Sequence, residues 1–582
     1  MTTPSKPLPL FFALTIIFLI PFISLLNNHF SVITAIKLIC RQTYKPPHAK
    51  QNGLVKSSNE RDKSRLWREP FIGFKNIDDS SSISRPISPN ISDCFPVELP
   101  SNAITPAHCC PSKPSFSKIL DFKDFASPST TLRVRKPFHL LDNEDIAKFE
   151  KGIALMKALP DDDPRSFIQQ AKVHCAYCNG AYHLSHPFQD TKLDIHRSWF
   201  FFPFHRWYIY FFERILGNLI GDPNFALPFW SWDSIEGMQM PSYFANPNSS
   251  LYHKLRHQKH LPPHVVDLNY ASESSYVPSH QQVSYNLATM YRQMVLASTT
   301  ELFMGGPFRL GDNPRPGPGS VEAAPHNTVH TWVGGAETPN HEDMGTFYTA
   351  ARDPIFYGHH SNLDRMWAIW KTLGEGRKDY SDEDWLDSEF FFYDENANFV
   401  RVKVRDCVDT KSLGYVYQDV DLAWLRTPPT SRKSKLLRQR KKAKVWSSKP
   451  RKFPLVLDSV TSVIVKRAKK WRSKEEKEEE EEVLVIEGIE FGSDKFVKFD
   501  IHVDDDEDRL SNPDETEFVG SFVSLYHGRG HKISTSFKVG ISKVLENLEA
   551  EEDDDLLVTL VPKLGKGDVI IGSIKIQFIP KQ

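Results

Sequence analysis

The sequence predicts a mainly α domain built around a helical bundle, followed by a separate antiparallel β-sandwich domain. From about residue 94 to residue 426, several stretches carry apolar residues at helical spacing, among many aromatic residues and histidines. After residue 483, short β-type runs alternate with turns that contain Gly, Asp or Pro. The chain has 582 residues, which is too many for one ordinary core, so more than one domain is expected.

Three segments of the first part have the pattern of helices. Residues 142–159 begin with acidic side chains, and their apolar positions recur at helical spacing: Ile146, Phe149, Ile153 and Met156. Residues 204–219 and 287–299 also have the pattern of helices. We therefore expect residues 91–427 to form the helical domain.

A basic segment separates the two predicted domains. Residues 428–452 begin with a proline pair and continue with RKSKLLRQRKKAK, which indicates an exposed linker. Residues 453–582 then contain the strand-like runs PLVLDSVTSVIV, VLVIEGIEF, KFVKFDIHV, FVGSFVSLYH, LLVTLVP and VIIGSIKIQFI. Within this predicted β-sandwich, the charged stretch at residues 466–482 is expected to be a solvated loop.

The first residues have the pattern of a targeting segment. Lys6 precedes an apolar run over residues 8–26, so residues 1–30 are interpreted as a signal peptide or targeting segment, and residues 31–90 as a linker or processed segment. The pattern favours the secretory pathway, with the vacuole or the cell exterior as destination; a plastid, in its thylakoid lumen, is the alternative. We expect the mature protein not to be embedded in a membrane.

Charge and cysteine content narrow the function classes. Lys and Arg (72) nearly cancel Asp and Glu (73), so no excess of charge argues for nucleic acid as a partner. Five of the seven cysteines lie between residues 94 and 178, which suits local cross-links in an oxidising compartment. Free buried thiols remain the alternative. No role is predicted for Cys40 or Cys407.

Six histidines form two groups with the character of metal ligands. The first group is His174, His196 and His205, and the second is His326, His330 and His360. His326 and His330 are four residues apart and share one helical face, so both can reach one ion. A single histidine is more often a structural residue than a ligand, but two groups of three in aromatic surroundings predict a metal site. Imidazole suits copper and zinc alike, so the residues alone leave the metal open.

Longer motifs carry a family resemblance. The strings HCAYC, FFPFHRWYIYFFERILG, HNTVHTWVGG and DPIFYGHHSNLDRMW resemble, in this order, the two copper-binding regions of plant polyphenol oxidases, the catechol oxidase and tyrosinase family. The string DWLDSEFFFYDENANFVRVKVRDC and the surroundings of KFVKFDIHV resemble the segments that follow the copper domain in that family. The resemblance therefore spans about residue 94 to the C-terminus.

The resemblance implies a pair of copper ions per chain. His174, His196 and His205 would bind the first ion, and His326, His330 and His360 the second. His360 is preferred over the adjacent His359 because Asp364 follows it by four residues, as in the family pattern. The nearby His183 is left out of the ligand set.

The resemblance also implies covalent links and residues beside the copper ions. A thioether would join Cys178 to His196, and disulfides would join Cys94 to Cys110 and Cys109 to Cys175. Phe347 matches the bulky gate residue above the second copper. Glu322 matches the acidic residue that holds a water molecule, and Asn327 would help to position that water, which favours monophenol hydroxylation.

The implied activity is oxidation of o-diphenols to o-quinones, with reduction of O2 to water. Ortho-hydroxylation of monophenols is a second activity that the sequence leaves open, as it leaves open the physiological phenol and the oligomeric state. The β-sandwich would shield the site in a latent proenzyme, which a protease would activate by cutting the exposed basic segment between Thr427 and Lys474. The alternatives are a specialised phenol hydroxylase or cyclising oxidase of secondary metabolism, a dinuclear copper oxygen carrier, and a zinc protein.

Overall fold

The structure is a computed structural model that describes residues 85–581, apart from 105–107, 113–117, 125–130, 274–276, 375, 433–450, 506 and 529–530. The predicted targeting segment, Cys40 and most of the predicted basic linker lie outside these residues. Among the described helices, none combines the length and apolar character needed to cross a bilayer. Residues Ser81–Gln582 form one compact unit.

The helical part begins with α2, Asn143–Ala158, at the place that the sequence predicts. Asp142 caps this helix, since its side chain accepts a hydrogen bond from the backbone N–H of Asp145, and the Asp145 side chain accepts from the backbone of Asp142 in return. Phe149, Ile153 and Met156 are buried and Ile146 is half-buried, so the predicted apolar face points into the core.

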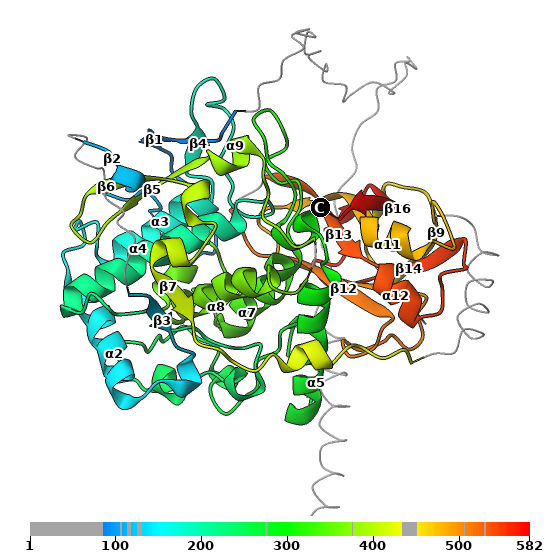
Figure 1. The fold of residues 1–582 in the computed structure, drawn as a ribbon, viewed down its shortest axis with the longest axis horizontal. Coiled ribbons are helices and arrows are strands. Elements are labelled where there is room, and N and C mark those ends of the chain that lie inside the picture. The colour runs from blue at the N-terminus through cyan, green and yellow to red at the C-terminus, as the bar shows by residue number, and fades with distance from the viewer. Residues whose placement is uncertain are drawn as a thin grey trace, which may run out of the picture. The chain divides into compact units, whose positions relative to one another are not determined.

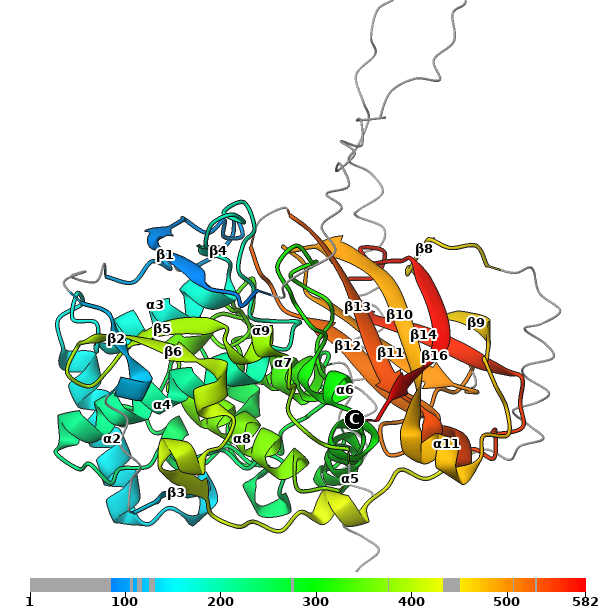
Figure 2. The ribbon, with the colours of Figure 1, turned by 45° about the horizontal axis from the view of Figure 1, so that its top comes forward.

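The remaining helices of this part are labelled in Figure 1, except α6, which is labelled in Figure 2. They are α3 Phe167–Cys178, α4 Phe201–Ile220, α5 Ser279–Tyr291, α6 Thr300–Met304, α7 Asn327–Val333, α8 Ile355–Trp370 and α9 Glu383–Leu386. Helix α5 begins earlier than predicted and continues as a π-helical turn, Arg292–Leu296, because the predicted range 287–299 contained only its most apolar section. A second π-helical turn, Glu322–His326, leads into α7. These helices confirm a mainly α first part.

Small sheets close the helical part. Strand β1 (Pro89–Cys94) pairs with β4 (Tyr182–Leu184), and β3 (Arg133–Arg135) pairs with β7 (Tyr415–Tyr417). A third sheet has the order β2-β6-β5, formed by Leu120–Asp121, Phe399–Lys403 and Glu389–Tyr393. These strands bring residues from both ends of the helical part together, because each sheet pairs segments that are far apart in the sequence.

Two antiparallel sheets make up the C-terminal part (Figure 2). One has the order β12-β11-β14-β9, with strands Phe518–Ser524, Val497–Val503, Asp555–Leu564 and Thr461–Lys466. The other contains β13 (Lys532–Gly540), β10 (Glu480–Gly492), β15 (Ile570–Ile571) and β8 (Leu455–Val456), and β16 (Ser573–Pro580) pairs with β10. Apolar residues from both sheets share one buried cluster, as the alternating sequence predicts.

The predicted loop at residues 466–482 is different in the structure. Helix α11, Lys474–Glu479, begins at the cap Ser473, and β10 begins at Glu480. Glu482 is buried and pairs with Arg467 at 2.7 Å, so part of the acidic run lies in the sheet because it has a buried cationic partner. Strand β13 and helix α12 (Ser542–Asn547) were not among the predicted elements.

The two parts are in direct contact. Strand β12 packs against the π-helical turn Glu322–His326 and against α7, and β13 packs against α6. Thr346 of the helical part pairs with Tyr526 of the β part in an isolated β-bridge. Contacts thus join the β-sheets to the helical part within one compact unit, and the division of this unit into two separate domains stays a prediction.

Candidate metal centre

The first group of histidines comes together from two helices and the loop between them. His174 lies on α3, His205 lies in the second turn of α4, and His196 lies in the loop that precedes α4. All three side chains are buried. Together with the sulfur of Cys178, their ligand atoms lie within 4.8 Å of one another.

The second group comes from two other helices. His326 ends the π-helical turn, His330 follows one turn later on α7, and His359 and His360 lie on α8. Ligand atoms of these four buried histidines also lie within 4.8 Å of one another. The predicted sharing of one face by His326 and His330 agrees with ring centroids that are 4.6 Å apart.

The two groups are adjacent. The rings of His205 and His360 stack with centroids 4.3 Å apart, and the rings of His196 and His326 lie 5.7 Å apart. Two ions held by the two groups would therefore be close neighbours. The four helices that carry the histidines, α3, α4, α7 and α8, lie in the helical part in Figure 1.

The imidazoles have the protonation that metal ligands need. Burial lowers the pKa of every one of these histidines, and the neighbouring rings lower it further in most of them; the pKa of His205 falls to about 3 and that of His330 to about 4. At neutral pH the rings are therefore uncharged, and each keeps a lone pair on one nitrogen.

Backbone carbonyls orient four of the rings. The Nδ1 atom of His205 lies 2.7 Å from the Phe201 carbonyl oxygen, and Nδ1 of His330 lies 2.7 Å from that of Met344. His174 and His326 make the same kind of contact, to the carbonyl oxygens of Phe347 and Glu322. A carbonyl oxygen only accepts, so Nδ1 carries the proton and Nε2 carries the lone pair.

The remaining nitrogens fit a metal pair. In the described part of the chain, Nε2 of His174, His196, His326 and His359 and Nδ1 of His196 and His360 have no hydrogen-bond partner although they are buried. Nε2 of His330 and Nε2 of His360 face each other at 3.4 Å. Unpartnered buried nitrogens are costly unless an ion or another group occupies the space beside them. The donor set of neutral imidazoles suits copper, so the residues fit the pair of copper ions that the sequence predicts.

His359 and His360 differ in their hydrogen bonds. The indole N–H of Trp232 donates to Nδ1 of His359 at 3.1 Å, so the neutral ring of His359 carries its proton on Nε2. The ring of His360, in contrast, stacks on that of His205 in the first group. This arrangement favours His360 as the ligand and a positioning role for His359.

A buried ion network lies behind both groups. Asp364, one turn after His360, accepts hydrogen bonds from Arg206, which follows His205 directly, and from the hydroxyl of Tyr415 at 2.6 Å. Arg135 lies 3.3 Å from the same carboxylate. Asp364 does not contact a histidine in this network; it ties helix α8 to helix α4 through Arg206.

Phe347 and Glu322 lie beside the histidines. The ring of Phe347, which the resemblance places above the second copper, stacks on His196 of the first group with centroids 3.8 Å apart and lies 6.4 Å from the ring of His326 in the second group. Oε1 of Glu322 accepts a hydrogen bond from the backbone N–H of Arg197 at 2.6 Å, whereas its Oε2 has no partner among the described residues. Burial raises the pKa of Glu322 to about 8.

A segment of the β part covers this site. The side-chain amide of Asn327 donates to the carbonyl oxygen of Val523 at 2.9 Å, and Arg197 donates to the hydroxyl of Ser524 at 3.3 Å. His527 accepts a hydrogen bond from Arg197 at 2.8 Å, and its ring meets the ring of Phe347 edge-on at 4.3 Å. Sequence reasoning missed His527, because a lone histidine in a β-rich segment carries no spacing signal.

The cysteines are arranged as follows. Cys94 is bonded to Cys110, and Cys109 to Cys175. Cys178 is a buried thiol whose sulfur lies in the first histidine group, 4.0 Å from Nε2 of His205. Burial raises its pKa well above the usual value.

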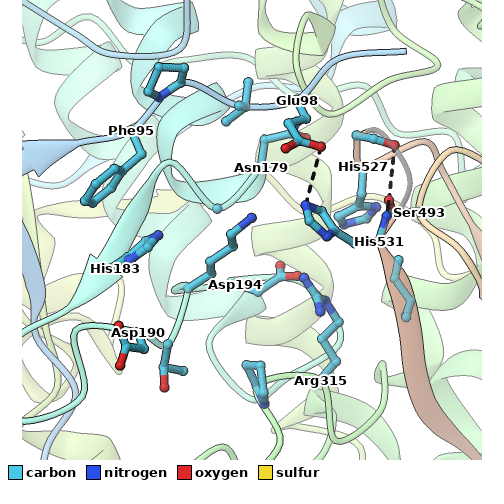
Figure 3. A pocket seen from close by; sticks show the side chains of 18 residues that line it. Phe95, Glu98, Asn179, His183, Asp190, Asp194, Arg315, Ser493, His527 and His531 are labelled. Carbon is cyan, nitrogen blue, oxygen red and sulfur yellow. Dashed lines mark hydrogen bonds and ion pairs between the residues drawn. The ribbon is translucent and has the colours of Figure 1, made fainter. Parts of the chain in front are cut away.

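A cavity of about 610 Å³ lies beside the covering segment (Figure 3). Among the residues that line it, His527 and Asp194 are buried, whereas Glu98 and His531 are exposed and form an ion pair, which Figure 3 marks with a dashed line. His183, which sequence reasoning left out of the ligand set, lies on the wall of this cavity, where its ring stacks on Phe95. The cavity therefore ends at the residues that cover the histidine groups.

Three family models match the chain. The common central domain of tyrosinase matches residues 164–373, which carry both histidine groups. The polyphenol oxidase middle domain matches residues 379–430. The chloroplastic polyphenol oxidase C-terminal domain matches residues 453–578.

Similar proteins agree with these models. The chain is 50% identical over 601 residues to a chloroplastic polyphenol oxidase of Malus domestica, which covers 99% of this chain and 98% of the relative. It is 53% identical over 511 residues to the aureusidin synthase of Antirrhinum majus, with 86% and 90% covered. A solved structure of latent apple tyrosinase superimposes with a TM-score of 0.74 at 55% identity, and covers 79% of this chain and 100% of that one.

These relatives are enzymes by name, which disfavours the oxygen-carrier alternative. The match to the tyrosinase domain and the two histidine groups also disfavour the zinc alternative. The chain belongs to the plant polyphenol oxidase family: it is an oxidoreductase of the catechol oxidase and tyrosinase type, with two copper ions as its cofactor and O2 and small phenols as the substrates that fit.

Proposed function

We propose that His174, His196 and His205 bind one copper ion and that His326, His330 and His360 bind the other. The observation that carries this assignment is the set of buried, neutral imidazoles with unpartnered nitrogens in two adjacent groups. The bound copper pair supplies the electron transfer by which one O2 gains four electrons and four protons to become two waters. Two o-diphenols lose these electrons and protons and become o-quinones.

The chain's own residues position the phenol and accept its proton. Phe347 restricts the ring of His196 by stacking on it and offers an aromatic face to a phenol. Oε2 of Glu322 is the base that we assign to the incoming phenol, acting directly or through a water that Asn327 helps to hold. Burial alone favours the protonated form of Glu322, and the positive charge of the bound copper ions would favour the carboxylate that this role needs. The Oδ1 atom of Asn327 has no partner in the described residues, so it has the capacity for this contact.

The adjacent histidines of α8 provide the sharpest test of the ligand set. We expect His360→Ala to lose copper and oxygen uptake on 4-methylcatechol, and His359→Ala to keep about two coppers per chain. Copper is measured by elemental analysis and uptake with an oxygen electrode, on the same samples. If His359→Ala loses copper and His360→Ala keeps it, then His359 is the ligand and His360 the positioning residue.

We also propose a thioether between the sulfur of Cys178 and a ring carbon of His196. This bond would replace one S–H and one C–H bond, and O2 would take up the two electrons and two protons released, by way of the bound copper pair. The sulfur of Cys178 lies within 4.8 Å of a ligand nitrogen of His196 and 4.0 Å from Nε2 of His205. In copper-loaded protein, a thioether leaves Cys178 unreactive to iodoacetamide after unfolding and joins two peptides in a digest. Free alkylation of Cys178 in active, copper-loaded enzyme contradicts the bond.

A latent state is the third proposal. Residues 453–582 act as a separate β-sandwich domain that shields the catalytic domain, residues 91–427, and an activating protease cuts within or near the basic linker at 428–452. The contacts of Asn327, Arg197 and Phe347 with the segment from Val523 to His527 support it, and the solved apple relative is named latent. Limited proteolysis that removes residues 453–582 should raise oxygen uptake on 4-methylcatechol. Unchanged oxygen uptake after complete removal would contradict the proposed latent state.

The compartment proposed is the plastid. The Malus relative is named chloroplastic, whereas the names of the relatives do not support the secretory or vacuolar route that the first residues favour. Residues 1–90 fused to a fluorescent protein should enter plastids of leaf cells. Accumulation of the fusion in the vacuole or outside the cell would restore the secretory route.

A narrower substrate range is the second candidate function. The aureusidin synthase relative is named for a specialised product and is 53% identical to this chain. Uptake on 4-methylcatechol and on tyramine, measured after proteolysis, separates three results. Activity on both indicates a tyrosinase, activity on the catechol alone indicates a catechol oxidase, and activity on neither by copper-loaded protein favours a specialist.

A further inference from the structure

Arg197 is a buried cation directly beside the histidine groups. It follows the proposed ligand His196, and its side chain is 4% exposed. Its backbone N–H donates to Oε1 of Glu322, and its carbonyl oxygen accepts from the N–H of Gly317. Its φ is 60°, in the left-handed region that residues other than glycine rarely adopt. Both bonds are made to residues of the helical part, so neither anchor of this unusual backbone lies in the β part.

The charge of Arg197 is only partly balanced. Nε of Arg315 lies 2.6 Å from Oδ2 of Asp194, and Nη2 of Arg197 lies 3.4 Å from the same oxygen, so the carboxylate belongs mainly to Arg315. Two guanidinium groups share one carboxylate, which leaves one positive charge in excess. Glu322 meets the backbone of Arg197, and bound copper ions would add further positive charge. Nε of Arg197 has no hydrogen-bond partner among the described residues.

The β part meets this cation with neutral groups. Nη1 of Arg197 donates to the hydroxyl of Ser524 at 3.3 Å, and Nη2 donates to Nε2 of His527 at 2.8 Å. Nδ1 of His527 lies 3.0 Å from the carbonyl oxygen of Leu525, so Nδ1 carries the proton and Nε2 is the acceptor. The covering segment therefore occupies the donors of Arg197 without supplying the negative charge that a buried cation favours.

The place of His527 has two kinds of neighbour. Its ring meets the ring of Phe347 edge-on at 4.3 Å, while its Nε2 accepts from Arg197. The adjoining cavity of about 610 Å³, lined by His527, Asp194 and Arg315, offers room beside this place (Figure 3). When the β part is removed, an aromatic ring can contact Phe347 there while an anionic group of the same molecule accepts from Arg197.

We propose that Arg197 is a specificity-determining residue, which binds the carboxylate of acidic o-diphenols in the uncovered enzyme and makes it prefer them to neutral o-diphenols. This inference rests on the proposed oxidation of o-diphenols and on the proposed latent state. A guanidinium group can donate two parallel hydrogen bonds to a carboxylate, and Arg197 has both Nη atoms free once Ser524 and His527 are removed. Because the carboxylate is remote from the reacting hydroxyls, the preference should appear mainly in KM.

The test compares dihydrocaffeate with its methyl ester, which carry the same catechol ring and differ by one negative charge. Oxygen uptake by copper-loaded enzyme, after proteolytic removal of residues 453–582, gives kcat and KM for each compound. We expect kcat/KM to be roughly 10- to 100-fold higher for the acid, the range that a hydrogen bond between charged groups provides. Equal values for acid and ester overturn this inference alone, whereas oxidation of neither compound overturns the proposed function on which it rests.

Variants assign the preference to Arg197. Arg197→Gln should bring the ratio of the two kcat/KM values close to one, and this ratio cancels any loss of folded or copper-loaded protein because both substrates are measured on one sample. Arg315→Gln should also lower the ratio, since it leaves Asp194 to pair with Arg197; the Arg315 side chain is 24% exposed, so this variant should fold. Lys192→Gln is the matched control, because Lys192 lines the same cavity. A wild-type ratio in both arginine variants, or an equal loss in Lys192→Gln, contradicts the assignment.

Discussion

Replacement of His527 should release the cover over the copper site. The ring of His527 accepts a hydrogen bond from Arg197 and meets Phe347 edge-on. Burial lowers the pKa of Arg197 only to about 10, so its guanidinium is still charged at neutral pH, and the pKa of His527 is low enough for a neutral acceptor. His527→Ala removes both contacts at once.

The magnitude follows from these two contacts. A hydrogen bond to a charged group contributes about 1.5–3 kcal/mol, and an aromatic pair about 0.5–1.5 kcal/mol. A loss of about 2–4 kcal/mol corresponds to a roughly 30- to 1000-fold larger population of the uncovered state. Uptake by the uncleaved enzyme should therefore rise steeply, up to the limit set by the cleaved enzyme.

The assay is oxygen uptake on 4-methylcatechol at equal copper content, before and after proteolysis. His527→Phe keeps an aromatic ring but loses the acceptor, so it should give an intermediate rise. His531→Ala is the control, because His531 is exposed and lies 3.6 Å from Glu98 at the cavity rim. If uncleaved His527→Ala matches wild type, or if His531→Ala rises as much, the segment does not limit access.

Three further results are expected. Asp364→Asn leaves Arg206 buried without its anion, which should lower the unfolding free energy of copper-free protein by about 3–5 kcal/mol in denaturant titrations, whereas the exposed Asp421→Asn should leave the midpoint unchanged. Burial opposes ionisation of Asp500, but the neighbouring Lys498 lowers the pKa of Asp500 to about 2. The ionised carboxylate therefore contributes about 2 kcal/mol to the unfolding free energy above about pH 4, and this contribution is lost as the pH falls toward 2. In acid titrations of stability, Asp500→Asn should lack this loss. Removal of copper by a chelator should abolish uptake, and about two coppers per chain should restore it, whereas zinc should not.

Local signals in the sequence predicted much of the centre. The spacing of His326 and His330 predicts a shared site because residues four apart lie on the same face of a helix. In the structure, His326 lies at the start of α7 and His330 lies on it. Helix α2 was predicted because its acidic first residues and its apolar spacing lie close together in the sequence, and the structure adds the cap that Asp142 and Asp145 form. Helical spacing and the first turn of a helix depend only on residues that are close in the sequence, so both can be predicted before the fold is known.

Contacts between distant segments could not be predicted in this way. The bond from Asn327 to Val523 joins residues 196 positions apart and uses a backbone carbonyl, which has no sequence signature. The acidic run near Glu482 was taken for a solvated loop because its partner Arg467 lies elsewhere in the sequence, directly after strand β9. Charge alone indicates exposure, and only the fold shows that a charge is paired.

One loop links the copper ligands to the cover. The carbonyl oxygens of Met344 and Phe347 orient His330 and His174, one ligand from each group. Between these two residues, Thr346 pairs with Tyr526 of the covering segment. The proposed covering segment therefore also contacts the loop that orients these two histidines, so its removal should loosen copper binding as well as open the site.

We accordingly expect the cleaved enzyme to lose copper to a chelator faster than the latent enzyme. A ligand that is held in its binding orientation rebinds the ion before it escapes, and mutation of such supports typically costs 10- to 100-fold in affinity. Copper loss is followed by the absorbance of the chelator complex, at matched protein concentrations and with residual uptake measured in parallel. Equal rates for the two forms would mean that the loop keeps its conformation without Tyr526, and that the β part controls access alone.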